Sequence, residues 1–361
     1  MKTLTSIDGD VENVDAFVRS ELDSGRKLMG FGHRVYKTED PRATHLRKVS
    51  EELADDRTIG ETAESLVKYV SRSGTPMEAL RTLISALAVD DPDGSETSPE
   101  ANRGKATRLV AQMPMLVARY EAARRGRQVP APAADLGIAG DFLLQITGER
   151  PSERAAQIMD ECLVLHADHT MNASTFTARV IAATLSDMHS AITAAIAALK
   201  GPLHGGANAE VMKMLLDIGR DAGGERAEQW VRAKLARKEK IAGFGHRVYR
   251  TEDPRATHLR RFSKLLGDKT GEPQWFEMSQ RIEQLVRAEK SLHPNVDFYS
   301  ASAFHSLGIP IDLYTPIFAV SRISGWTAHV LEQYAHNRLI RPRTDYIGPR
   351  YPQTFLPVEQ R

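Results

Sequence analysis

The stretch PIFAVSRISGWTAHVLEQY at residues 316–334 decides the fold class. Its apolar side chains recur every three or four positions, which is the repeat of one face of an α-helix. Pro316 opens the stretch, as proline does in the first turn of many helices. The pattern therefore predicts one long helix with a buried face. That face consists of Ile317, Val320, Ile323, Thr327, Val330, Leu331 and Tyr334.

Two further stretches show the same period. The first follows Ser98-Pro99-Glu100, a predicted N-cap and first turn, and ends at Arg124-Arg125-Gly126, which suits a helix C-terminus. Pro114 lies inside it, so the sequence predicts a kink there or two shorter helices. The second runs from Phe176 to Leu199 and stops at Gly201-Pro202. Because alternating strand patterns of useful length are nearly absent, we predict an all-α fold.

Composition narrows the class of protein. The chain has 361 residues, with 48 Lys and Arg against 47 Asp and Glu, so its formal net charge is +1. Proteins that bind nucleic acid usually carry a basic surplus, so no nucleic acid partner is predicted. No apolar run approaches the roughly 20 residues of a membrane span, and no signal peptide follows Met1. The single cysteine, Cys162, fits a reducing compartment. We therefore predict a cytoplasmic protein, not bound to membranes, that acts on something small.

One segment occurs twice. Residues 30–47 read GFGHRVYKTEDPRATHLR, and residues 243–260 read GFGHRVYRTEDPRATHLR. Seventeen of the eighteen positions are identical, and the exception, Lys37 against Arg250, keeps its charge. A single pair so far apart is not a stacked array, which needs several copies at a short period. The near-identity indicates a recent duplication, a recombination or an artificial origin of one copy.

Four polar clusters are candidates for chemistry. His166 and His169 are three residues apart on a predicted helix and could share a zinc ion, but no third ligand follows at a familiar spacing. No metal site is therefore predicted. GFGHRV lacks the third glycine of the dinucleotide fingerprint and follows no predicted strand, which argues against a Rossmann site. The clusters are residues 166–169, LHGGAN at 203–208, the two GFGHRVY segments, and NVDF at 295–298.

The positive ends of predicted helices should set the charge or the ligand preference of three of these side chains. His204 precedes a predicted helix that opens near Asn208, and the positive end of a helix favours a neutral imidazole, which can donate to an oxygen that gains charge. Asp297 follows a predicted N-cap, Asn295, and the same dipole favours the carboxylate that a general base requires. Arg255 lies in the first turn of its own helix, where a cation is disfavoured, and this indicates an anionic partner. A purely structural role is an equal alternative for each residue.

Together these motifs resemble a known family. LHGGAN at 203–208, GFGHRVY at 243–249, VDFYS at 296–300 and NRLIRPR at 337–343 occur in one order, with His169 before them. The series resembles citrate synthase and its close relative 2-methylcitrate synthase, over roughly residues 75–350.

The resemblance implies an acyltransferase of the tricarboxylic acid cycle, in which the acyl group is converted to alkyl on transfer. Such an enzyme condenses acetyl-CoA with oxaloacetate and hydrolyses citryl-CoA to citrate and CoA. Asp297 would take the methyl proton, His204 would stabilise the enol or enolate, and His246 would polarise the ketone and protonate the new alkoxide. No metal or other cofactor is implied, because acetyl-CoA is a substrate.

The resemblance also implies the binding residues and a homodimer. Arg341 would reach the site from the other subunit, and several arginines suit a dicarboxylate because each can hold a carboxylate with two hydrogen bonds. The implied oxaloacetate ligands are His169, His246, Arg255, Arg322 and Arg341. The implied CoA contacts are Arg250, Gly243, Phe244 and Gly245.

The family fold is an all-α homodimer in which a smaller domain closes over a larger one and excludes water. We expect the large domain to comprise residues 1–205 and 301–361, and the small domain residues 206–300. Residues 1–74 depart from the family pattern and contain the first copy of the repeat. Only the second copy lies between His204 and Asp297, so we predict that it works and that His33 and Arg42 belong to a passive copy.

Three other functions remain open. A 2-methylcitrate synthase would use propionyl-CoA, which differs by one methylene and is selected by pocket shape. The atypical N-terminus leaves room for a non-catalytic protein of this type that binds a dicarboxylate or CoA. A metal-dependent hydrolase that uses His166 and His169 is the third and weakest.

Overall fold

The computed structural model describes residues 59–219, 224–246, 248–352 and 354–360. These residues form helices and connecting loops without a strand, and one isolated bridge joins Phe244 to Pro294. The predicted all-α fold is confirmed. No helix of this part is long and apolar enough to cross a bilayer. The first copy of the repeat, residues 30–47, lies outside the described residues.

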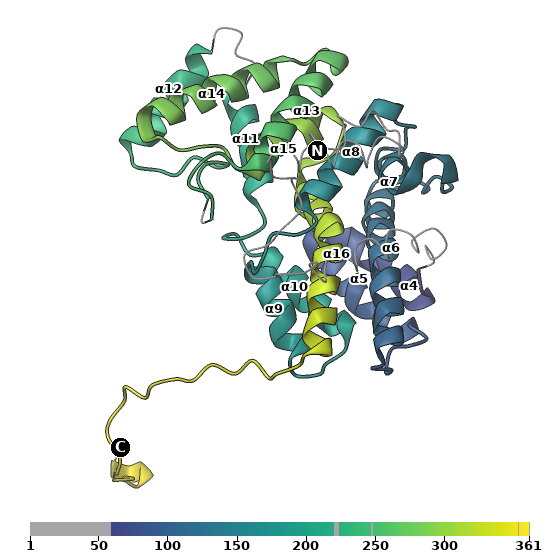
Figure 1. The fold of residues 1–361 in the computed structure, drawn as a ribbon, viewed down its shortest axis with the longest axis vertical. Coiled ribbons are helices and arrows are strands. Elements are labelled where there is room, and N and C mark those ends of the chain that lie inside the picture. The colour runs from purple at the N-terminus through teal and green to yellow at the C-terminus, as the bar shows by residue number, and fades with distance from the viewer. Residues whose placement is uncertain (1–58, 220–223, 247, 353, 361) are drawn as a thin grey trace, which may run out of the picture.

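The helices fall into two groups by their contacts (Figure 1). The first group comprises α4 (Glu61–Ser73), α5 (Pro76–Asp90), α6 (Pro99–Arg124), α7 (Gly137–Thr147), α8 (Glu153–His166), α9 (Ala173–Ala182), α10 (Met188–Leu199) and α16 (Tyr314–Ala335). The second comprises α11 (Ala207–Ile218), α12 (Glu225–Ala236), α13 (Pro254–Thr270), α14 (Gln274–Lys290) and α15 (Val296–Ser306). Short 3-10 turns lie at η2 (Ala134–Leu136), η3 (Ile311–Leu313) and η4 (Val358–Gln360).

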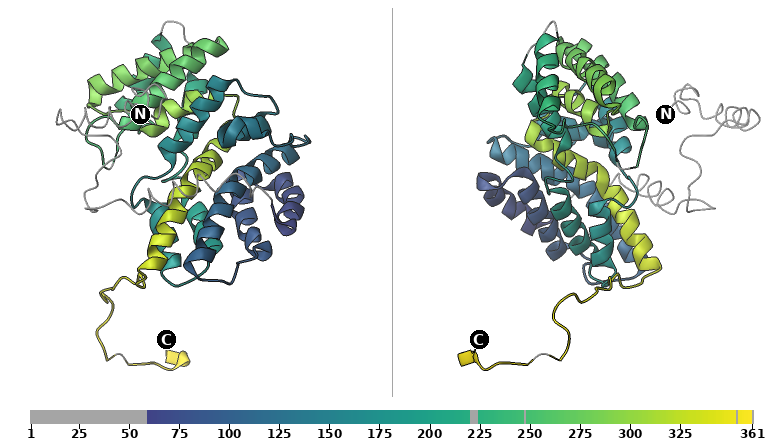
Figure 2. Two further views of the ribbon diagram at one scale, coloured as in Figure 1. Left: turned by 45° about the vertical axis from the view of Figure 1, so that its right-hand side comes forward. Right: turned by 90° about the vertical axis from the view of Figure 1, so that its left-hand side faces the viewer.

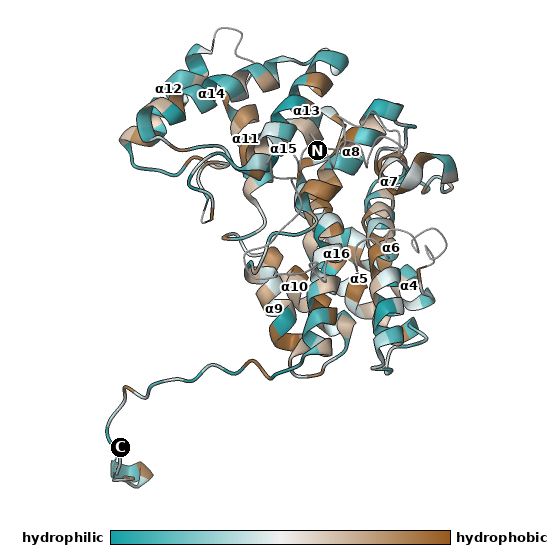
Figure 3. Ribbon diagram, viewed as in Figure 1, coloured by the Kyte–Doolittle hydropathy of each residue, from teal (hydrophilic) through white to brown (hydrophobic). Residues whose placement is uncertain are grey.

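α16 is the central helix of the first group. It packs against α6, α8, α9 and α10. Five residues of the predicted buried face are buried and two, Leu331 and Tyr334, are only partly buried; the five are Ile317, Val320, Ile323, Thr327 and Val330. The predicted long helix over residues 316–334 is confirmed, with its start at Tyr314. Figure 3 shows α12, α13 and α14 as mostly hydrophilic, so these helices bury only a stripe and leave the rest to solvent.

Two predicted helices have different bounds in the structure. α6 is a single helix of 26 residues with Pro114 inside it, so the alternative of two shorter helices is wrong. Its predicted N-cap is confirmed, because the Ser98 side chain accepts from the Ala101 N–H at 3.2 Å. The stretch 176–199 forms two helices, α9 and α10, instead of one. Leu185 adopts a left-handed φ of 63°, and Asp187 caps α10 by accepting from the Ser190 N–H at 2.9 Å.

The segment before His169 lies very close to α16, and a glycine makes this possible. A Cβ on Gly325 would lie 2.4 Å from the carbonyl oxygen of Ala167 and 3.0 Å from Oδ1 of Asp168. Asp168 also contacts α16 through Nε2 of His329, at 3.2 Å. The loop that carries His169 is therefore positioned by direct contact with α16.

Gly325→Ala should move this loop and destabilise the fold by roughly 1–3 kcal/mol, because the added methyl meets backbone that cannot rotate away. Gly104→Ala in α6 is the matched control. Its Cβ would meet the side chains of Arg108, at 3.1 Å, and Asp93, at 3.6 Å, and no backbone comes as close. Alanine in a helix gains about 1 kcal/mol over glycine. Urea denaturation of both variants measures the difference. Equal free energies of unfolding for the two variants would contradict the close approach at Gly325.

Candidate active site

The loop that precedes His246 is fastened to the start of α15. The Gly245 N–H donates to the His293 carbonyl and the Asn295 N–H donates to the Gly243 carbonyl, both at 2.9 Å. The Asn295 side chain adds a bond from Nδ2 to the Gly245 carbonyl at 3.0 Å. These bonds hold the loop of the second repeat copy beside the N-terminus of α15, where Asp297 lies.

Glycine is required at the first position of this loop. Gly243 has a φ of 81°, and a Cβ there would lie 2.7 Å from the ring of Phe298. Phe244 packs on the same ring with centroids 4.5 Å apart. The backbone of the loop thus passes directly over α15, which explains why the motif begins with glycine.

His246 has a defined neutral form. Its Nδ1 accepts from the backbone N–H groups of Val248, at 2.9 Å, and Tyr249, at 3.1 Å, so its proton lies on Nε2. That Nε2 lies 3.0 Å from Nε2 of His169, which is the acceptor of the pair. Burial lowers the pKa of His246, and burial followed by the charge of Arg255 lowers the pKa of His169 to about 4. The two imidazoles that sequence separates by 76 residues therefore meet, both uncharged at neutral pH.

His204 also has a defined neutral form. Its Nε2 accepts from the Ser174 N–H at 3.1 Å, which leaves the proton on Nδ1. Ser174 Oγ lies 2.9 Å from the same nitrogen and accepts from Nε1 of Trp326 at 3.1 Å. Burial, followed by the charge of Arg322, lowers the pKa of His204. The helix N-terminus that this imidazole contacts is that of α9, so the predicted contact with the helix near Asn208 is corrected.

The pKa of the Asp297 carboxyl differs from the prediction. The N-cap is as predicted, because Asn295 Oδ1 accepts from the Asp297 N–H at 3.0 Å. The net effect on the carboxyl is the opposite of the expected one: burial raises its pKa to about 6, while the charges of Arg255 and Arg322 lower it less. Burial outweighs the helix dipole here because α15 begins inside the protein, under the loop of Gly243.

Arg255 has an anionic partner within its own helix. Asp253 caps α13 by accepting from the Arg255 N–H at 3.0 Å, and its two oxygens accept from Nε at 3.0 Å and Nη2 at 2.8 Å. Burial opposes ionisation of Asp253, but these hydrogen bonds outweigh it and lower its pKa. The positive charge of Arg255, which the helix dipole disfavours, is thus balanced by the carboxylate of Asp253. Its charge still acts on His169 and Asp297.

Arg322 is a buried cation whose charge is only partly compensated. Its side chain is on α16 and the residue is 1% exposed. Nε donates to the His166 carbonyl at 2.8 Å, and the guanidinium lies over the Phe318 ring, 4.7 Å from its centroid. Among the described residues it forms no ion pair, although Asp168 and Asp297 act on it at longer range. Burial lowers its pKa to about 10, so it stays charged at neutral pH.

Two predicted site residues lie outside this cluster. Arg341 is exposed on the extended stretch after α16, which leads away from the helices (Figures 1 and 2). Arg250 is exposed on the loop between α12 and α13. The cluster within this chain thus comprises His169, His204, His246, Arg255, Asp297 and Arg322.

The structure gives no support to a metal site at the histidine pair. Within the described part of the chain, no group of three His, Cys, Asp or Glu side chains is arranged to hold a metal ion. His166 is buried, its Nδ1 lies 2.8 Å from the Cys162 carbonyl, and burial lowers its pKa to about 3. Its place under Arg322 makes it a packing residue of the site wall.

Three contacts of the site were missed from the sequence. Ser174 orients His204, Trp326 holds Ser174, and His329 holds Asp168 beside His169. Asn172 is the N-cap of α9, and its Oδ1 accepts from Ser174 Oγ at 2.8 Å. Only the N-cap Asn172, two residues before Ser174, could have been read from the sequence. The contacts of Trp326 with Ser174 and of His329 with Asp168 join residues more than 150 positions apart.

Known proteins resemble this chain over most of its length. The family described as "Citrate synthase, C-terminal domain" matches residues 49–343 and, separately, residues 1–72. The chain is 50% identical to citrate synthase 2 of Bacillus subtilis over 99% of this chain and 96% of the relative. It is 41% identical to citrate/2-methylcitrate synthase of the same organism, over 92% and 88%. The crystal structure of citrate synthase from Pyrobaculum aerophilum has a TM-score of 0.79 and 39% identity, and covers 87% of this chain and 81% of that one.

At pH 7 we expect the His204 proton on Nδ1 and the His246 proton on Nε2, because backbone N–H groups occupy the other nitrogens. Both rings are neutral at pH 7, because this pH is above the ordinary imidazole pKa of about 6.5 and the fold lowers both pKa values further. Nitrogen-15 correlation spectra of histidine-labelled protein report the tautomers, with His204→Gln and His246→Gln spectra for assignment. A protonated Nε2 on His204 would contradict the assignment.

Proposed function

The chain belongs to the citrate synthase family, and on this premise we propose that it condenses acetyl-CoA with oxaloacetate and hydrolyses citryl-CoA to citrate and CoA. It is an enzyme that transfers an acyl group. The observation that carries the assignment to this cluster is the buried Arg322, a cation beside neutral histidines and without a paired carboxylate. An anionic ligand supplies what this arrangement lacks.

Oxaloacetate would occupy the space between the two helix groups. Arg322 has guanidinium N–H groups without a hydrogen-bond acceptor in the described part of the chain, and a substrate carboxylate would accept from them. Arg255 adds a second positive charge nearby. The Nε2–H of His246, which donates to His169, would donate to the ketone oxygen instead and so polarise the carbonyl carbon.

Acetyl-CoA would be activated by Asp297 and His204. The Asp297 carboxylate would accept a methyl proton, and its pKa of about 6 makes it a stronger base than an ordinary aspartate, yet ionised at neutral pH. The Nδ1–H of His204 would donate to the thioester oxygen as negative charge develops there. The enolate carbon then attacks the ketone carbon, and Nε2–H of His246 protonates the alkoxide. No metal or redox step is needed for this sequence.

CoA would be bound by the loop of the second repeat copy. Of Gly243, Phe244 and Gly245, the last presents backbone that a ligand can approach closely, because a Cβ there would have only Leu292 within 4 Å, at 3.9 Å. Gly243 instead lets the loop lie against Phe298 of α15. Arg250 is exposed on the same loop and is free to reach a phosphate group. These contacts complete the proposed substrate site.

The two helix groups would act as two domains. The first group supplies His169, His204 and Arg322, and the second supplies His246 and Asp297. We assign residues 206–300 to the smaller domain and the rest to the larger one, with the boundary inside α15, which ends at Ser306. The two sets already meet in this structure, because Nε2 of His169 lies 3.0 Å from Nε2 of His246. Separation of the two groups would admit the substrates, and closure would exclude water from the condensation.

The stretch after α16 supports a homodimer. It exposes seven large apolar side chains, which a monomeric protein rarely does over so short a segment. A second copy would cover them, and Arg341 on the same stretch would then reach the partner's site. The exposed residues are Leu339, Tyr346, Ile347, Tyr351, Phe355, Leu356 and Val358.

Propionyl-CoA is the second candidate substrate, because a relative at 41% identity is named citrate/2-methylcitrate synthase. A thiol-release assay with oxaloacetate and either thioester decides between them by kcat/KM. Release from neither, by a folded protein, would contradict the enzyme assignment.

Asp297→Asn should lower kcat by about 10²–10⁴-fold, the usual worth of a general base. Its melting temperature at pH 7.5 should not fall, because a carboxyl whose pKa is raised by the fold destabilises the fold above that pKa, and the amide removes this penalty. His33→Ala in the first repeat copy is the control and should keep wild-type turnover. Equal losses from both variants would overturn the choice of copy.

In the wild type, kcat/KM for acetyl-CoA should fall as the pH drops through the pKa of Asp297, because the protonated carboxyl cannot accept the methyl proton. That pKa is about 6, or somewhat higher once bound oxaloacetate neutralises the arginines that lower it.

Arg341 acting across a dimer predicts complementation. Arg341→Ala and Asp297→Asn should each be inactive as homodimers. Co-expressed, half of the dimers pair one chain of each kind, and one of their two sites is then complete, so roughly a quarter of wild-type activity should return. Sizing chromatography confirms the dimer. No recovery in the mixed dimer would place Arg341 in the site of its own chain, or outside the site.

A further inference from the structure

The imidazole ring of His169 is held by one hydrogen bond within the described residues, and the proposed reaction breaks that bond. It runs from Nε2–H of His246 to Nε2 of His169, at 3.0 Å. His246 would give up this contact when it donates to the ketone oxygen of oxaloacetate. Because Nε2 of His169 is an acceptor, its proton lies on Nδ1, which makes no hydrogen bond in the described part of the chain. A ring that stays ordered while the substrate is bound therefore needs a second contact.

The side chain of Tyr249 makes such a contact. Its ring stacks on the His169 imidazole with centroids 5.7 Å apart and planes inclined by 19°, and it meets the His246 ring at 4.7 Å. Both distances are within the range of favourable aromatic pairs. The backbone N–H of Tyr249 has a separate role, since it donates to Nδ1 of His246. Substitution of the side chain therefore leaves that backbone bond in place.

The other contacts of the loop hold its backbone and not the ring. Nδ2 of Asn172 donates to the His169 carbonyl at 3.4 Å, and Gly325 lets the Ala167 carbonyl approach α16. These contacts fix the position of the His169 Cα, but they leave χ1 and χ2 of the side chain unrestrained. The orientation of the imidazole thus depends on Tyr249 once His246 donates to the substrate.

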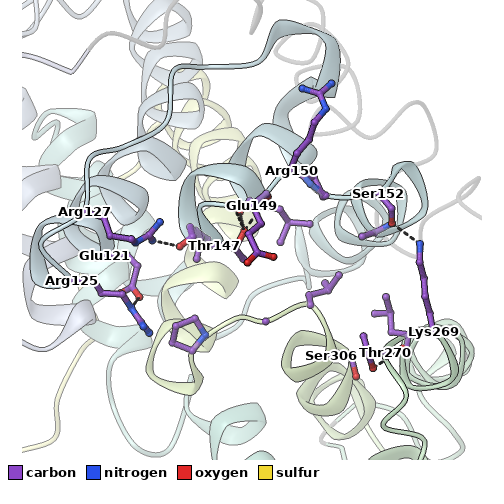
Figure 4. A pocket seen from close by; sticks show the side chains of 18 residues that line it. Glu121, Arg125, Arg127, Thr147, Glu149, Arg150, Ser152, Lys269, Thr270 and Ser306 are labelled. Atoms are coloured by element: carbon purple, nitrogen blue, oxygen red, sulfur yellow. Dashed lines mark hydrogen bonds and ion pairs between the residues drawn. The ribbon is translucent and has the colours of Figure 1, made fainter.

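The stack crosses between the two helix groups. His169 precedes α9 of the first group, whereas Tyr249 precedes α13 of the second, so the His169 ring gains this support only while the groups are together. The groups also meet far from the cluster, where Lys269 of α13 donates to Oγ of Ser152 at 2.7 Å (Figure 4). This second contact borders a cavity of about 520 Å³ that no residue of the cluster lines. It offers a comparison for the stack.

We infer that Tyr249 is a positioning residue, which orients the His169 imidazole so that its Nδ1–H can donate to a carboxylate of oxaloacetate. The inference rests on the proposed function, in which His169 is an oxaloacetate ligand. A flat ring suits this role because stacking restrains the plane of the imidazole without occupying either ring nitrogen. A phenylalanine would do the same, whereas a leucine would cover the imidazole less and would not fix its plane.

Calorimetric titration of oxaloacetate into the wild type, Tyr249→Leu and Tyr249→Phe tests the inference. Loss of the aromatic pair should raise the Kd roughly three- to tenfold in Tyr249→Leu, and Tyr249→Phe should keep nearly the wild-type Kd. In a His169→Ala background, Tyr249→Leu should change the Kd by no more than about twofold, because the tyrosine acts through that histidine. Lys269→Gln is the control for a general loosening of the two groups and should leave the Kd unchanged.

The free protein provides a readout without substrate. Burial, followed by the charge of Arg255, lowers the pKa of His169 to about 4, so nitrogen-15 spectra of the wild type should show a largely neutral ring down to about pH 5. Tyr249→Leu uncovers the ring and should raise this pKa, whereas Tyr249→Phe should not. The charged and titratable groups that act on His169 are the same in both variants: Arg255, His246, Arg322 and Asp253.

Four results would overturn the inference. They are a wild-type Kd in Tyr249→Leu, an equal loss in Tyr249→Phe, which would assign the role to the hydroxyl, an equal loss with and without His169, and an equal loss in Lys269→Gln. An unchanged pKa of His169 in Tyr249→Leu would also contradict it. If the wild type binds no oxaloacetate, the proposed function fails, and the spectra still decide whether Tyr249 covers and orients His169.

Discussion

The burial of the Arg322 guanidinium is the constraint on which the rest of the site depends. A charge that is 1% exposed loses its hydration, and neither one carbonyl acceptor nor the face of Phe318 restores it. The nearby carboxylates act only at longer range, and burial lowers the pKa of Arg322 to about 10. The protein therefore keeps a buried positive charge that an anion can bind, and the lost hydration of this charge lowers the stability of the folded protein.

α16 carries that charge and also organises the residues around it. Arg322, Trp326 and His329 follow at helical spacing and hold, in turn, the His166 carbonyl, Ser174 and Asp168. Through these contacts one helix positions the His169 loop and, by way of Ser174, the imidazole of His204. Gly325 lets the loop approach the helix closely enough for them to form. A single helix thus links the buried Arg322 to the tautomer of His204.

Local sequence predicted the features that depend on near neighbours. The period of residues 316–334, the N-caps Ser98 and Asn295, and the motif residues of the second repeat copy are all of this kind. The pKa of Asp297 was predicted in the wrong direction because a helix end is visible in sequence, whereas burial under a distant loop is not. The break between α9 and α10 was missed because both helices keep one apolar period across it, although Asp187 was a readable N-cap. The contact between Ser174 and Trp326 joins residues 152 positions apart, which only tertiary packing brings together.

Calorimetric measurement of oxaloacetate binding to the wild type and to Arg322→Gln tests the central claim most directly. Removal of a buried charged donor from a carboxylate costs about 2–5 kcal/mol, so the Kd should rise by at least roughly thirtyfold. Asp297→Asn, which leaves the arginines in place, should bind oxaloacetate with nearly the wild-type Kd. An Arg322→Gln variant that folds and binds oxaloacetate within threefold of the wild type would contradict the account.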